Sequence, residues 1–158
     1  MKSNAMPAGR QGFTVVELMV SMGILLILFA LTTINLTRLP SSASQSSSYD
    51  RLVSDLRSQQ TKSMTGYDSS PYGIHFENTS YTLFAGSDYT SDVSSYYVVA
   101  LDPNLTFTDI TFSNPQAVFE AGSGDIAGYL MGSDSVSITN TLTGEVKTLR
   151  LNKYGATE

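Results

Sequence analysis

A largely apolar run occupies residues 13–36, in which Glu17 is the only ionisable side chain. At about 1.5 Å per residue, a helix of this length reaches roughly 36 Å and covers a hydrocarbon core of about 30 Å. Lys2 and Arg10 precede the run, and Arg38 is the one basic residue close after it. The positive-inside rule therefore favours a cytoplasmic amino end. The pattern predicts one membrane-spanning helix followed by an exported domain.

A second helical pattern follows this run. Apolar residues recur at helical spacing on one side, while serine and charged residues fill the others; the apolar side carries Tyr49, Leu52, Val53, Leu56 and residues 60–64. Pro40 has no backbone N–H and clashes with the carbonyl of Leu36, so we expect a kink or break at residues 37–42. The serine-rich residues 41–48 are typical of a linker or glycan-bearing stalk, but a helix packing small side chains against a neighbour is favoured.

After Gly66 the apolar period changes to two. Residues 72–76 and 81–85 alternate, and residues 77–80 supply a turn, so a hairpin is predicted. Further short strands are expected at 96–101, 105–112, 117–121, 126–131, 136–139 and 146–152, the last two as a second hairpin. Dense Gly, Pro, Asn and Asp residues mark the turns. The predicted fold class is α+β, with a long helix packed along antiparallel sheet.

Composition narrows the range of functions. The net charge is −5 and the pI is about 4.7, so the field of the chain repels phosphate backbones and nucleic-acid binding is unlikely. Cysteine is absent, which excludes disulfides, lipoprotein acylation and thiolate chemistry.

Any interpretation of the apolar run must account for the carboxylate of Glu17 within it. A cleaved secretory signal, cut at 42–44, needs a shorter apolar core than this one. A plain signal anchor leaves Glu17 with a cost of roughly 2.5 to 3.5 kcal/mol at mid-membrane. A capping box from Thr14 to Glu17 gives the acid a local role but leaves Gly12 unexplained. A cut after Gly12 explains all of these features, because it creates an amine on Phe13 one helical turn before the acid.

Residues 12–18, GFTVVEL, followed by an apolar helix resemble the prepilin processing site of type IV pilins and type II secretion pseudopilins. The resemblance implies that a prepilin peptidase cleaves after Gly12 and methylates the new amine of Phe13. It also implies that Glu17 docks the subunit in its filament. Other pilin or pseudopilin subunits, an inner-membrane assembly platform and, before assembly, membrane lipid are the partners implied.

The resemblance also implies a pilin fold with a long bent amino-terminal helix, divided as follows. Residues 1–12 are the leader, 13–39 the membrane-spanning or filament-core helix, 40–66 its amphipathic continuation, and 67–158 an extracytoplasmic β-rich head. The implied location is the inner membrane, with a cytoplasmic amino terminus, and then a periplasmic or cell-surface filament.

The head bears a slighter resemblance to minor pseudopilin H and its fimbrial relatives. It is carried by residues 71–74 and 81–84 and by the closing residues 149–155. Some relatives bind DNA through a basic carboxyl end, and the end of this chain, KYGATE, departs from that pattern. A competence role in DNA uptake is an alternative that this departure disfavours.

No catalytic residue, metal site or cofactor is predicted. His75 alternates with Ile74 and Phe76, so we expect an exposed strand residue and not a catalytic base. Four aspartates fall in predicted loops, and turn chemistry is favoured over Ca²⁺ binding by residues 122–125; they are Asp88, Asp92, Asp125 and Asp134.

The sequence therefore predicts a structural subunit, a minor pilin or pseudopilin, and not an enzyme. The rival from another class is a signal-anchored exported binding or hydrolytic domain in which Glu17 only caps the helix.

Overall fold

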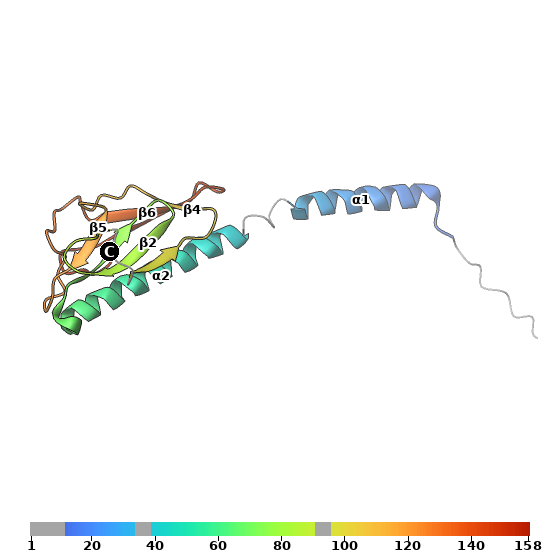
Figure 1. Cartoon of the computed structure of the whole chain (residues 1–158). Helices are drawn as coiled ribbons and strands as arrows, with labels where there is room; N and C mark the ends of the chain where they lie inside the picture. Colours follow the sequence, from blue (N-terminus) through green and yellow to red (C-terminus); the bar gives the residue numbers. More distant parts are fainter. Residues whose placement is uncertain (1–11, 34–38, 91–95) are drawn as a thin grey trace, which may run out of the picture. The chain divides into compact units, whose positions relative to one another are not determined.

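The computed structural model describes residues 12–33, 39–90 and 96–158. The chain divides into two units, Met1–Thr37 and Arg38–Glu158. The first unit contains helix α1, Val15–Thr33, and the second contains all other helices and strands of the described residues (Figure 1). The expected α+β class, with helices and antiparallel sheets, is confirmed, and the arrangement is compatible with a pilin fold.

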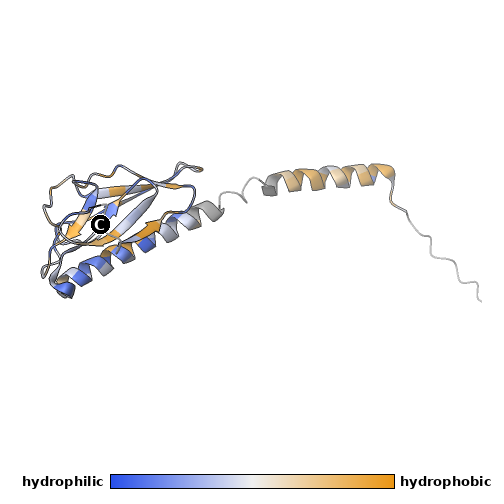
Figure 2. Ribbon diagram, viewed as in Figure 1, coloured by the Kyte–Doolittle hydropathy of each residue, from blue (hydrophilic) through white to orange (hydrophobic). Residues whose placement is uncertain are grey.

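Helix α1 is apolar along its length (Figure 2). Within the described residues, no helix combines the length and the hydropathy that a bilayer crossing needs. The spanning segment expected at 13–39 is therefore not found there, and residues 34–38 lie outside the description.

Helix α2 extends over Leu39–Met64. Pro40 is its second residue, a position where the backbone N–H has no intrahelical acceptor and proline is tolerated. The kink expected near Pro40 remains a prediction, because residues 34–38, immediately before Leu39, are not described. The helix ends where Gly66 takes a left-handed φ of 67°, and a short 3-10 turn, Tyr67–Ser69, leads into the strands.

Four strands form the first sheet: β1 Tyr72–Phe76, β2 Ser80–Ala85, β3 Tyr97–Ala100 and β5 Gln116–Phe119. Their order is β3-β2-β1-β5, and every neighbouring pair is antiparallel. The hairpin expected from residues 72–85 is confirmed, with Tyr72 opposite Ala85 and Phe76 opposite Tyr81.

Three strands form the second sheet: β4 Leu105–Thr108, β6 Ser135–Asn140 and β7 Val146–Arg150, in the order β4-β6-β7. The second expected hairpin, β6 with β7, is also confirmed. The strand expected at 126–131 is wrong, because Ile126 makes a single bridge to Phe119 and the chain then turns at Gly128 and Gly132, both with positive φ.

One hydrophobic core lies where α2 meets both sheets. Leu52 and Leu56 of α2 are buried against Ile74 and Phe76 of the first sheet and against side chains of the second sheet. Phe76 stacks on Phe112 and meets Phe107 edge-on, which joins the two sheets through aromatic contacts. The stripe predicted from helical spacing is confirmed at Leu52 and Leu56, but it is wrong at the end of the helix, where Thr61 and Met64 are exposed.

Candidate functional site: the amino end of helix α1

The amino end of α1 is capped by Thr14. Its hydroxyl oxygen accepts a hydrogen bond from the backbone N–H of Glu17 at 3.3 Å, and its carbonyl accepts one from Leu18 at 3.2 Å. These bonds satisfy donors that would otherwise lack partners in the first turn. The Thr14 half of the predicted capping box is therefore confirmed. It fixes the first helical residue at Val15, two residues after Phe13.

Three residues of the expected processing site are accessible. A Cβ placed on Gly12 would meet no other atom within 4 Å, and the side chain of Phe13 is 81% exposed. Glu17 is also exposed and forms no ion pair with any other described residue. One helical turn, about 6 Å of rise, separates Phe13 from Glu17. Gly12 and Phe13, the two residues at the expected cut, are therefore both exposed, as is Glu17.

The surface of α1 is hydrophobic on every side. Over residues 15–29 of the helix, the exposed fraction of the large apolar side chains ranges from 54% to 77%. A helix that is apolar all round is normally buried against other helices or in lipid. The hydroxyl of Ser21, one turn after Glu17, donates to the carbonyl of Glu17 at 2.7 Å, so this polar group is satisfied within the helix.

Comparison with known families gives one match. Residues 7–33 match the model of the prokaryotic N-terminal methylation motif, a segment that includes Gly12, Phe13 and Glu17. The chain carries the type IV pilin and pseudopilin signature. Neither the curated proteins nor the solved structures contain a match to this chain. The signature implies, in general, processing by a prepilin peptidase, a membrane-anchored location and assembly with other pilin subunits, and its family is typically structural.

In the part of the chain that follows this signature, buried polar side chains of α2 form hydrogen bonds with the head. Gln45 donates to the carbonyl of Ile138 in β6 at 2.9 Å and to that of Glu145, the residue before β7, at 3.1 Å. At the other end, the Ser63 hydroxyl accepts from the backbone N–H of Tyr72 at 2.9 Å. Sequence reasoning missed these contacts, because glutamine and serine carry no signal that separates a buried position from a solvated one.

Tyr81 makes the contact at the middle of α2. Its hydroxyl donates to the Asp55 carboxylate at 2.6 Å, although the tyrosine itself is 1% exposed. Burial, together with this bond, raises the pKa of Tyr81 far above its usual value, so the hydroxyl remains a donor at all ordinary pH values. Together with the bonds of Gln45 and Ser63, this bond ties α2 to the head along its length.

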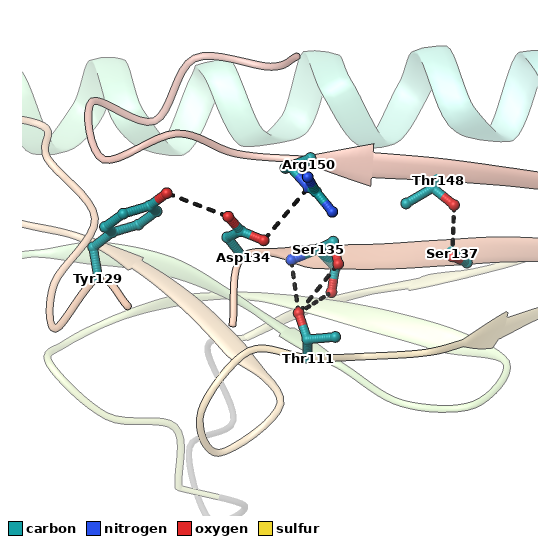
Figure 3. Close-up of polar contacts among 7 residues, drawn as sticks. All are labelled: Thr111, Tyr129, Asp134, Ser135, Ser137, Thr148 and Arg150. Atoms are coloured by element: carbon teal, nitrogen blue, oxygen red, sulfur yellow. Dashed lines mark hydrogen bonds and ion pairs between the residues drawn. The ribbon is translucent and has the colours of Figure 1, made fainter. Parts of the chain in front are cut away.

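Asp134 is the most buried of the three predicted loop aspartates that the structure describes, the others being Asp88 and Asp125. It is 4% exposed, accepts from the Tyr129 hydroxyl at 3.2 Å and pairs with Arg150 at 3.6 Å (Figure 3). The pair links the start of β6 to the end of β7, and hydroxyl pairs such as Ser137 with Thr148 continue along the sheet (Figure 3). Together these contacts hold the loop at Tyr129 and strands β6 and β7 to one another.

His75 corrects a prediction. It was expected on an exposed strand face, but it is half-buried and stacked on Tyr89 at a centroid distance of 4.0 Å. The loop after β2 folds over this face, where Gln116 holds it by accepting from the N–H of Tyr89 and donating to Asp88. Burial lowers the pKa of His75. Over the described ranges no cluster of His, Asp or Glu is placed to hold a metal, and Asp92 lies outside them.

Proposed function

We propose that this chain is a minor pilin or pseudopilin, a structural subunit of a type IV pilus or a type II secretion-type filament. It is cut after Gly12, methylated on Phe13 and assembled through its amino-terminal helix. The observation that carries the proposal is the pairing of the methylation motif with an exposed Phe13 and an unpaired Glu17 on a helix that is apolar all round.

Charge pairing supplies the docking mechanism. In a bundle of apolar helices, an isolated carboxylate or amine is costly to bury, whereas the two together are tolerable. Cleavage creates the amine at Phe13, and Glu17 of a neighbouring subunit neutralises it. The pair also sets the axial register, because any other offset leaves both charges unpaired.

Before assembly, the subunit resides in the inner membrane with residues 1–12 in the cytoplasm and the head outside. Membrane lipid covers the apolar surface of α1 in this state. An inner-membrane assembly platform then transfers the helix from lipid into the filament, where other subunits replace the lipid. Helix α2 and the head, which are joined by hydrogen bonds along α2, are carried with it.

Cleavage is tested by co-expressing the full chain with a prepilin peptidase and measuring intact masses. The expected product begins at a methylated Phe13. Gly12→Val should block processing, and because a Cβ at Gly12 meets no neighbouring atom, the block would report on the peptidase and not on misfolding. Gly9→Val, a second glycine of the leader, is the matched control and should be processed normally. A signal-anchored exported domain would keep its leader in every variant.

Docking is tested with Glu17→Ala and the isosteric Glu17→Gln. Both variants should insert and be processed, and both should be depleted from filaments, because each strands the amine of a neighbour in an apolar seam. Ser21→Ala, one turn along the same helix, should assemble normally. Wild-type incorporation of Glu17→Gln, measured by quantitative immunoblotting of sheared filaments, would refute the docking role.

A further inference from the structure

Strand β3 leaves one edge of the first sheet open. The N–H of Leu101 donates to the carbonyl of Thr79 at 2.9 Å, and the antiparallel register places Val99 opposite Tyr81. Hydrogen-bonding residues alternate along such a ladder, so the backbone groups of Val98 and Ala100 point away from β2. No described segment pairs with them, because β3 is the last strand of its sheet.

The other sheet edges are protected by the chain itself. Beside β5, the backbone N–H of Ala127 donates a hydrogen bond to the carbonyl of Val118. Beside β4, the N–H groups of Leu105 and Phe107 find carbonyl acceptors at Asp102 and Asn78. Strand β7 carries Lys147 and Arg150, and charged side chains on an edge discourage pairing.

Strand β3 has neither kind of protection. Its sequence, YVVA, is uncharged and rich in β-formers, and it appears as hydrophobic beside α2 in Figure 2. Tyr97 and Val98 are 61% and 60% exposed. An exposed edge of this composition is a template for an added strand.

Two hollows flank this edge on the side of α2. The hollow at the Tyr97 end measures about 340 Å³ and is lined from α2 by Gln59 and Lys62. Its lining contains no carboxylate, Lys62 makes no ion pair with a described residue, and the buried side-chain oxygen of Gln59 has no hydrogen-bond partner. The hollow at the Ala100 end, about 80 Å³, contains Arg51 and Asp102 together.

We propose that the free edge of β3 binds an extended segment of a partner polypeptide by strand addition, with a carboxylate of that segment beside Lys62. Backbone hydrogen bonds to Val98 and Ala100 supply affinity, and the side chains that alternate toward α2 enter the hollows and supply specificity. Charge complementarity identifies the occupant, because Lys62, which stands over the Tyr72 ring at 5.5 Å and forms no ion pair with a described residue, lines the larger hollow of a chain whose net charge is −5. The proposal does not depend on the filament role of α1.

A second copy of the chain fits this surface less well. Pairing of β3 with another β3 is sterically simple, but residues 97–100 carry no carboxylate, and Asp102, two residues further on, already lines the smaller hollow beside Arg51. Such a dimer would leave the cationic hollow unfilled. The partner segment therefore differs from β3 and carries an acidic residue within its pairing stretch.

The test uses the full chain in detergent micelles and fluorescent heptapeptides of alternating valine and threonine. In these peptides one threonine is replaced in turn by glutamate, glutamine or lysine, and binding is followed by anisotropy. Glutamate peptides should bind most tightly. Val98→Pro removes an N–H that the ladder with β2 does not use, and it should weaken binding by about tenfold or more. Lys62→Glu should transfer the preference from glutamate to lysine peptides.

Two control variants separate strand addition from general damage. Val98→Thr retains the N–H and should bind as wild type. Val146→Pro removes an N–H of β7 that points away from β6, on the other sheet, and should also leave binding unchanged. Absence of glutamate-peptide binding by wild type, or equal binding by Val98→Pro, would overturn the proposal. Self-association of wild type that Val98→Pro abolishes in sedimentation would assign the edge to a second copy instead, and so overturn the choice of partner.

Discussion

The bond between Tyr81 and Asp55 allows a quantitative test of how α2 is held to the head. Its two members differ in exposure, since Tyr81 is 1% exposed and the Asp55 side chain is 25% exposed. The two single substitutions should therefore have unequal costs. Tyr81→Phe leaves a carboxylate that water can reach, whereas Asp55→Ala leaves a buried hydroxyl with no acceptor.

The magnitudes follow from this asymmetry. Tyr81→Phe should cost about 1.5 kcal/mol of unfolding free energy, the low end for a hydrogen bond to a charged group. Asp55→Ala should cost about 3 kcal/mol, because the desolvation penalty of the orphaned hydroxyl is added to the lost bond. The double variant should cost less than the sum, since removing the hydroxyl removes that penalty. At about 4 °C per kcal/mol, the single variants should melt roughly 6 and 12 °C below wild type.

Near-UV circular dichroism of the full chain in detergent micelles is a suitable assay. All 9 tyrosines lie in residues 38–158, so the signal reports tertiary packing of the head and is insensitive to α1. Asp55→Asn, which keeps an acceptor oxygen, should recover much of the loss. Equal melting temperatures for Tyr81→Phe and Asp55→Ala, or additivity in the double variant, would refute this account of the contact.

Three further predictions concern the head. The pKa of Tyr81 is raised in the folded chain, so the contribution of its hydroxyl to stability is complete below the pKa of tyrosine in the unfolded chain, near 10, and is lost as pH rises above that value. Urea midpoints should therefore fall between about pH 9 and 11. The fall should be less steep in Tyr81→Phe. The lowered pKa of His75 gives a pH dependence of the opposite direction, because the unfolded chain binds the proton more readily below about pH 6.5. Stability should therefore decline toward pH 5. His75→Phe, which keeps a stacked ring, should remove that decline. Gly73→Ala places a Cβ 2.8 Å from both the Ala117 carbonyl oxygen and the Phe84 ring. It should lower the free energy of unfolding by about 1–3 kcal/mol. A melting temperature equal to that of wild type would contradict this and show that the sheet can move there.

Much of the local structure could be predicted. The buried stripe of α2 was predicted by 3.6-residue spacing around Leu52 and Leu56, and both hairpins were predicted by period-two stretches joined at short turns. The strand at 126–131 was wrong because Ile126 is buried at a single bridge, whereas Leu130 and Met131 stay exposed on a chain that turns at Gly128 and Gly132. Periodicity cannot separate these cases when the apolar run is short.

The sequence by itself determined the pilin-type signature, the apolar run behind it and the alternation of hairpins, because each depends on residues a few positions apart. Only the tertiary structure decided the placement of β5 beside β1, the burial of Gln45 and Ser63, the cover over His75 and the open edge at Val98. These features arise when segments distant in the chain pack together. Which face becomes buried and which edge remains unpaired depends on the position of every other element, and local spacing does not specify that.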